Sequence, residues 1–140
     1  MDEWDKDSEE ISKVVPDKEK ARSLLRLVEL REKDLAGKTE EFSTLIVEGR
    51  YEIVKELITA LMSADGYKSL SHKLLISYLK EFYPDFSMGE IILLDQLRKI
   101  RNDIAYRGLM IKPDYLQRNV SEILEITTKL KKILLRKLNL

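Results

Sequence analysis

The chain has 140 residues, with 25 basic and 25 acidic side chains, so its formal net charge at pH 7 is zero. Hydrophobic residues make up 44% of the chain and charged residues 36%, which is typical of a folded globular domain. The balanced charge gives no support for general nucleic-acid binding, and the lack of cysteine excludes disulfides and cysteine nucleophiles. With a single histidine besides, we expect neither a metal site nor a cofactor.

No apolar run approaches the ~20 residues of a membrane span, and the acidic N-terminus lacks the apolar core of a secretory signal. We therefore expect a cytoplasmic protein without membrane contact. Residues 1–15 are polar and acidic, and we expect an N-terminal tail here, with Trp4 docking on the rest of the protein. Residues 16–140 are expected to form one helical domain.

The first two helices of that domain are marked by their ends. Pro16 and Asp17 are typical of a helix start, and apolar residues then recur at helical spacing until Gly37. A second helix is predicted from about Thr39 to Ser63. Gly49, in the middle of that helix, could allow a neighbouring helix to approach closely.

Three further helices are predicted. The third covers about residues 69–82 and ends before a proline, the fourth covers about 90–106 and ends at Gly108, and the fifth begins at Lys112-Pro113-Asp114. No stretch alternates apolar and polar residues as a strand would. The prediction is an all-α, mostly up-and-down bundle of four or five helices, whose short connections make neighbours antiparallel.

Arg101 is the most unusual residue of this pattern. It lies on the apolar stripe of the fourth helix, four residues after Leu97 and three before Ile104, where an aliphatic side chain is expected. An arginine is almost never fully buried unless it is paired. Either the helix is turned so that Arg101 reaches an edge, or the charge serves a cleft or a subunit interface.

The neighbours of Arg101 suggest a phosphate-binding site. Asn102 and Tyr106 share a helix face, so one turn offers a cation, an amide and a phenol. The candidate phosphate contacts are Arg98, Arg101 and Arg107. The alternative is purely structural: Asp103 pairs with Lys99 or Arg107, and Asn102 and Tyr106 form hydrogen bonds across the bundle.

Two other features allow a functional and a structural interpretation. Residues 129–140 carry five basic side chains and no acid, which could attract phosphate or simply suit the end of a helix. His72 near the start of the third helix could act in catalysis, but a packed or capping role is the more common one for such a histidine.

The segment Leu97-Arg98-Lys99-Ile100-Arg101-Asn102-Asp103-Ile104-Ala105-Tyr106 resembles the signature of the HEPN family, the higher eukaryotes and prokaryotes nucleotide-binding domains. That signature is an arginine, often followed by a polar residue, with a histidine a few residues later, just before the last helix of the bundle. Residues 66–75, from Gly66 to His72 and beyond, look like a second family segment that opens the third helix. The similarity extends over roughly residues 16–138.

The resemblance implies a homodimer, or a partner of a minimal nucleotidyltransferase in a toxin–antitoxin pair. It also implies RNA or nucleotide binding and metal-independent endoribonuclease activity, with the motif residues Arg101, Asn102 and Tyr106 as the catalytic group. Tyr106 stands where the family has histidine. Histidine titrates near neutral pH and tyrosine near pH 10, so the motif is degenerate. The alternative function is a non-catalytic dimeric module that binds a nucleotidyltransferase.

Overall fold

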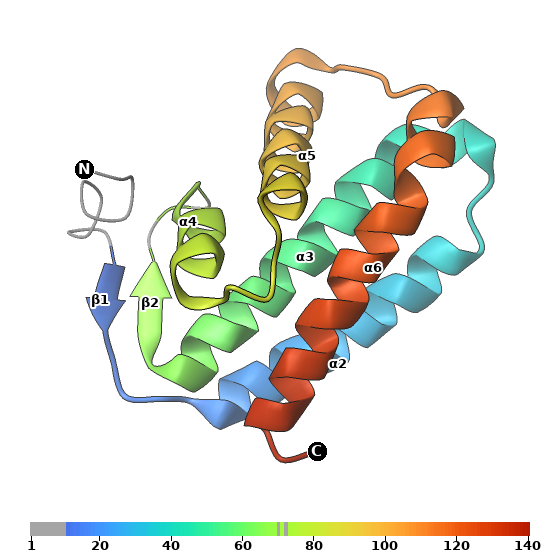
Figure 1. The fold of residues 1–140 in the computed structure, drawn as a ribbon. Helices are drawn as coiled ribbons and strands as arrows, with labels where there is room; N and C mark the ends of the chain where they lie inside the picture. Colours follow the sequence, from blue (N-terminus) through green and yellow to red (C-terminus); the bar gives the residue numbers. More distant parts are fainter. Residues whose placement is uncertain (1–10, 70, 72) are drawn as a thin grey trace.

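The computed structural model describes residues 11–69, 71 and 73–140 of the chain (Figure 1). Within these residues the predicted all-α bundle is confirmed, with five α-helices and one small sheet. The helices are α2 (Lys18–Ala36), α3 (Ser43–Asp65), α4 (Lys73–Phe82), α5 (Met88–Arg107) and α6 (Pro113–Lys137), and the short 3-10 helix η2 (Glu40–Phe42) precedes α3. The expected docking of Trp4 lies outside the described residues.

Helix α3 is the centre of the bundle. Helices α2 and α6 cover one side of it and α4 and α5 the other, and α2 and α3 run antiparallel (Figure 1). Buried residues therefore occur all round α3, including the acidic Glu56. A helix buried on every side must supply a partner for each charge that it carries, because a lone buried charge is costly.

The sheet corrects the prediction that the chain forms no strands. Strand β1 (Ile11–Lys13) pairs antiparallel with β2 (Tyr67–Ser69), so residues 11–13 belong to a sheet rather than to a tail, and α4 begins at Lys73 rather than near Ser69. Strands of three residues are too short for alternation to be recognised.

Gly66 makes the turn from α3 into β2. Its φ of +87° lies in the left-handed region, and the oxygen of Val14 would lie 2.8 Å from a Cβ added there. The backbone N–H of Val14 donates to the Gly66 carbonyl at 2.8 Å, which ties the chain after β1 to the end of α3. A glycine is required at this position for both conformational and steric reasons.

The close helix approach predicted at Gly49 is confirmed. Leu35 of α2 packs so near to α3 that its Cδ2 atom would lie 2.7 Å from a Cβ on Gly49. Helix α5 begins with a capping box in which Ser87 and Glu90 satisfy each other's backbone N–H groups. None of the described helices is long and apolar enough to cross a membrane.

Candidate nucleic-acid interface

A basic groove runs between α4 and α5. Its volume is ≈ 570 Å³, and isoleucines of both helices form part of its lining. One acid and four cations surround it, namely Asp95 with Lys73, Lys80, Arg98 and Lys99. The sequence analysis proposed Arg98 as a phosphate contact, and the structure places it in this groove together with Lys73 and Lys80 of α4, which the linear pattern did not connect to it.

Asp95 is shared between two of those cations. Arg98 donates from Nε to Asp95 Oδ1 over 3.1 Å, and Lys99 Nζ lies 3.1 Å from the other carboxylate oxygen. Partial burial raises the pKa of Asp95, but the hydrogen bonds from Lys99 and Arg98 outweigh this effect and hold the pKa below its usual value. A single carboxylate therefore offsets two positive charges, and the groove keeps an excess of positive charge.

Arg101 lies one turn beyond Arg98 and points toward α3. Its side chain is 26% exposed, and its Nε lies 3.3 Å from Glu52 Oε1. The Nε–H is buried and makes no hydrogen bond with any described residue, so the contact is an ion pair without a well-aligned hydrogen bond. The charge on the apolar stripe thus has an intramolecular partner, which the sequence analysis did not identify.

Glu52 joins two cations as Asp95 does. Lys55 Nζ lies 2.5 Å from its Oε2 atom, opposite the Arg101 contact. Burial raises the pKa of Glu52, but the hydrogen bond and charge of Lys55 and the charge of Arg101 bring the pKa below its usual value. Glu52 is consequently ionised at neutral pH in the folded protein.

Tyr51 of α3 is influenced by the charges of both arginines. Its ring is buried, and burial raises the pKa of its hydroxyl to about 12, although the charges of Arg98 and Arg101 act in the opposite direction. Since both guanidinium groups influence this hydroxyl, Tyr51 connects the groove to the Arg101–Glu52 pair. The sequence analysis did not name Tyr51, because its nearness to α5 arises only from the packing of separate helices.

The remaining motif residues point elsewhere. Tyr106 is 81% exposed, and Arg107, whose side chain is 80% exposed, lies 3.8 Å from Asp103. An α-helix turns about 100° per residue, so Tyr106 leaves α5 about 140° round from Arg101. Asn102 is half-buried and has no hydrogen-bond partner in the described part of the chain. One chain therefore does not bring Arg101 and Tyr106 together.

The structural alternative for these residues is present only in part. Arg107 pairs with Asp103 as that alternative predicts, whereas Lys99 pairs with Asp95. The exposure of Tyr106 excludes a hydrogen bond from it across the bundle.

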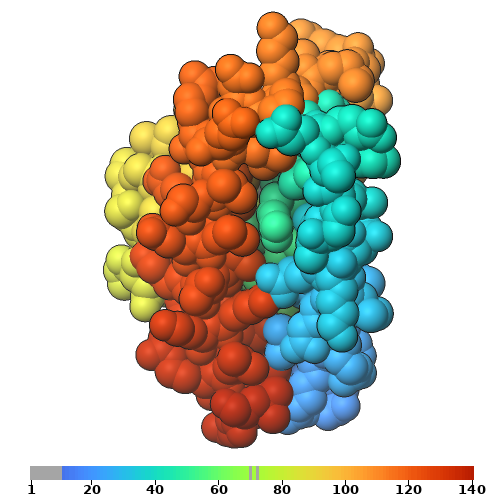
Figure 2. Space-filling view, turned by 90° about the vertical axis from the view of Figure 1, so that its right-hand side faces the viewer, coloured from blue at the N-terminus to red at the C-terminus, as the bar shows by residue number. Residues whose placement is uncertain are grey.

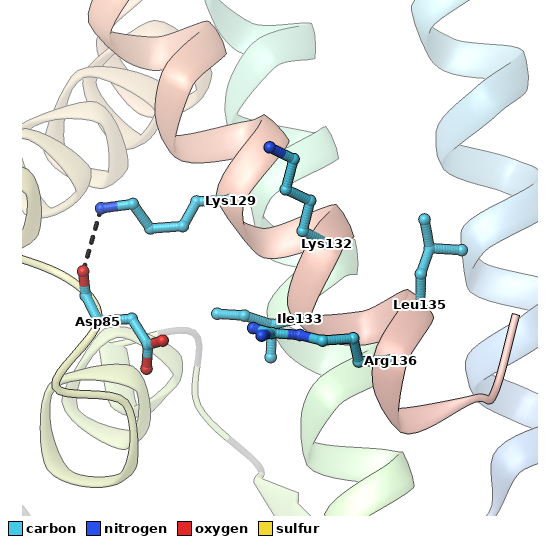
Figure 3. A pocket seen from close by; sticks show the side chains of 6 residues that line it. All are labelled: Asp85, Lys129, Lys132, Ile133, Leu135 and Arg136. Carbon is cyan, nitrogen blue, oxygen red and sulfur yellow. Dashed lines mark hydrogen bonds between the residues drawn. The ribbon is translucent and has the colours of Figure 1, made fainter.

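The basic run of residues 129–140 mainly ties α6 to the bundle. Lys129 Nζ donates to the Asp85 carbonyl at 3.0 Å and to Glu90 at 2.8 Å, and Figure 3 shows it reaching across to Asp85. Lys131 pairs with Glu32, and Lys137 Nζ lies 2.6 Å from Asp65. The other two cations that line the hollow in Figure 3, Lys132 and Arg136, have no ion-pair partner among the described residues.

His72 lies outside the described residues, so its predicted packed or catalytic role is not tested. Over residues 11–69, 71 and 73–140, no three histidine, cysteine or acidic side chains form a group that could hold a metal ion.

No protein-family profile, curated protein or solved structure matches this chain. The interpretation of the groove therefore depends on the geometry and charge of its own residues.

Proposed function

We propose that this chain is a HEPN-like protein that binds RNA or a nucleotide in the groove between α4 and α5. The observation that carries the proposal is the gathering of Lys73, Lys80, Arg98 and Lys99 around a single carboxylate. The whole chain has no net charge, so the four cations around one carboxylate are a local excess of positive charge.

The groove suits a single strand better than a duplex. Its cations can contact phosphates, while Ile76, Ile91 and Ile92 offer apolar surface for a base. Ser77 and Gln96 supply the polar groups that a base edge or a ribose needs. Binding of this kind weakens with added salt because counterions are released from the phosphates.

The catalytic extension of the proposal is a metal-independent endoribonuclease of the toxin–antitoxin type. Arg101 would stabilise the phosphate, Asn102 would position it, and Tyr106 would take the place of the family's histidine. Because Arg101 and Tyr106 diverge on one helix, such a site needs a second copy of the chain to bring Tyr106 of one subunit toward Arg101 of the other.

A second candidate function, the dimeric interaction module that binds a nucleotidyltransferase, is favoured by one surface. Tyr106, Leu109 and Met110 are exposed at the end of α5, and Leu45 is exposed beside Thr44, whose hydroxyl accepts from the Ile111 N–H at 2.8 Å. This apolar end patch is suited to a second copy of the chain. Sedimentation equilibrium tests it: Met110→Glu should convert a dimer to a monomer, and a wild-type monomer would contradict the dimer.

RNA crosslinking tests the principal proposal. Single-stranded RNA that contains 4-thiouridine is irradiated with the protein in EDTA, and the crosslinked peptides are mapped by mass spectrometry. We expect the crosslinks to fall in α4 and α5, and crosslinks confined to α6 would contradict the assignment. The same samples on a gel report cleavage, and Tyr106→His is the variant expected to gain activity if Tyr106 makes the motif degenerate.

A further inference from the structure

A second groove lies on the opposite side of α3, between α2 and α6. Figure 2 shows the hollow between the blue-to-cyan helix α2 and the orange-to-red helix α6, with the green of α3 at its floor. Its volume is ≈ 350 Å³. Leu35 of α2 and Leu116 and Val120 of α6 contribute to its walls, and Ile46 and Arg50 of α3 contribute to its floor.

One polar contact near each end limits the length of this groove. Near Arg50, the ion pair between Glu32 of α2 and Lys131 of α6 joins the two walls. Toward η2, the Gln117 amide donates to Glu40 over 3.4 Å. The groove is therefore a short trough with a polar contact near each end, and its volume lies at the lower end of the ~300–1,000 Å³ typical of small-molecule sites.

Arg50 is the exceptional residue of the trough. Its Nε is buried, and none of its nitrogens has a hydrogen-bond or ion-pair partner among the described residues. Burial lowers the pKa of Arg50, and the charge of Glu32 offsets that effect only in part, because Glu32 is engaged by Lys131. The Glu32 carboxylate therefore lies close enough to raise the pKa of Arg50, but it is paired with Lys131 and does not pair with Arg50.

Arg31 is an arginine of this bundle for which the chain itself supplies the anionic partner. Arg31 of α2 donates from Nε to both carboxylate oxygens of Glu56, at 2.9 and 3.0 Å. Burying a guanidinium without such a partner is costly. Arg50 is half-buried at the trough, and its buried Nε–H has no partner among the described residues, so a ligand in the trough can supply the missing anion.

We propose that the trough between α2 and α6 binds a small amphipathic carboxylate, with its carboxylate on Arg50 and its apolar chain against Leu35, Ile46 and Leu116. A guanidinium presents two parallel N–H groups that match a carboxylate. Lys38 and Glu40 also line the trough, but Lys38 pairs with Asp34 and Glu40 accepts from Gln117, so Arg50 is the lining cation without a partner among the described residues. One such cation suits a single negative charge. If each non-hydrogen atom takes about the 30 Å³ that water occupies in the liquid, the trough accommodates roughly a dozen atoms. A saturated acid such as decanoate fits that size.

Titration by two-dimensional NMR of ¹⁵N-labelled protein tests this proposal with four probes: decanoate, decanol, acetate and decyl phosphate. We expect saturable shifts in the signals of α2, the first half of α3 and the first half of α6 with decanoate. Decanol lacks the charge and acetate lacks the chain, so each should bind at least about tenfold more weakly, the cost of losing one charged or apolar anchor. Decyl phosphate separates a preference for a carboxylate from a preference for any anion, and tighter binding of decyl phosphate than of decanoate overturns the assignment to carboxylates.

Arg50→Met removes the proposed anchor, and Arg118→Met is the matched control, because Arg118 is an exposed arginine of α6 outside the trough lining. Arg50→Met should lose decanoate binding by about tenfold or more, while Arg118→Met should bind as the wild type does. Unfolding in urea should show Arg50→Met to be at least as stable as the wild type, since the substitution removes a half-buried cation that has no partner among the described residues. A loss of stability would instead indicate that Arg50 has a structural partner.

Val120→Phe narrows the trough without touching Arg50 and provides an independent variant. Decanoate should bind this variant more weakly although the cation is intact. Unchanged binding by Arg50→Met or by Val120→Phe, or decanoate shifts spread over the whole surface, overturns the proposal. Arg50→Met should leave RNA crosslinking to α4 and α5 unchanged, so this inference and the proposed RNA function fail or succeed separately.

Discussion

Two glutamates of α3 are each paired with an arginine from another helix. Arg31 of α2 forms a two-pronged pair with Glu56, and Arg101 of α5 lies beside Glu52 on the next turn of the same helix. The acids are buried or half-buried because α3 is covered on all sides. At the residue scale, therefore, Arg101 first serves to connect α5 to α3, and any contact with phosphate is made by a cation already held in place.

The contacts of Glu52 with Lys55 and Arg101 predict a dependence of stability on pH. The pKa of Glu52 lies below its usual 4.5 in the folded protein, so the unfolded chain binds the proton more tightly. Its contribution to stability is complete above about pH 4.5 and is lost as the pH falls through the lowered pKa. Glu52→Gln should reduce the free energy of unfolding at pH 7 by about 1–3 kcal/mol, with a smaller difference from the wild type near pH 3.

Urea unfolding at several pH values measures this difference. Glu122→Gln on the exposed face of α6 is the control and should change stability by less than about 0.5 kcal/mol throughout. Replacing both partners, in Glu52→Gln with Arg101→Met, should cost less than the sum of the single changes. A difference between Glu52→Gln and the wild type that stays constant with pH would contradict the ion pair.

At the scale of elements, the junction between α3 and β2 is constrained by both backbone conformation and packing. Gly66 adopts a left-handed φ of +87° and lies against the Val14 carbonyl, which follows β1. The turn therefore fixes both the end of the central helix and the pairing of the two strands. The two short strands, β1 and β2, pair residues that are more than 50 positions apart in the sequence, with Ile11 opposite Ser69.

Gly66→Ala should destabilise the protein by at least about 2 kcal/mol, because an alanine is strained at positive φ and its Cβ would clash with the Val14 oxygen. Gly37→Ala is the matched control, since Gly37 has a φ of −93° and no neighbouring atom within 4 Å of an added Cβ. That variant should be as stable as the wild type or slightly more so. Equal stability of the two variants in urea unfolding would show that the turn carries no such constraint.

At the scale of the whole molecule, helical periodicity and end signals predicted the bundle well. Asp17, Gly49, Gly108 and Pro113 have the local roles that their residue types favour. The two strands were missed because pairing between distant three-residue segments leaves no local pattern. Such features arise only when the chain is folded.

The candidate site was predictable to a similar extent. Arg101 stands out because it lies on an apolar stripe, and Arg98 was predicted as a phosphate contact one turn before it; both signals are local. The α4 lysines, Tyr51 and Glu52 join them only through packing of separate helices, which no spacing within the sequence reveals. The acids of α3 did offer an indirect signal, since a helix that is apolar on most of its circumference must pair the charges that it carries.

The most direct test of the account is the affinity for single-stranded RNA of two double variants that each remove two positive charges. Lys80→Gln with Lys99→Gln alters the groove between α4 and α5, and Lys132→Gln with Arg136→Gln alters the hollow beside α6. Fluorescence anisotropy at low salt should show about tenfold weaker binding or more for the groove variant, a flatter salt dependence, and nearly wild-type affinity for the α6 variant. Equal weakening by both variants, or no binding of RNA by the wild type, would contradict the proposal that this groove binds nucleic acid.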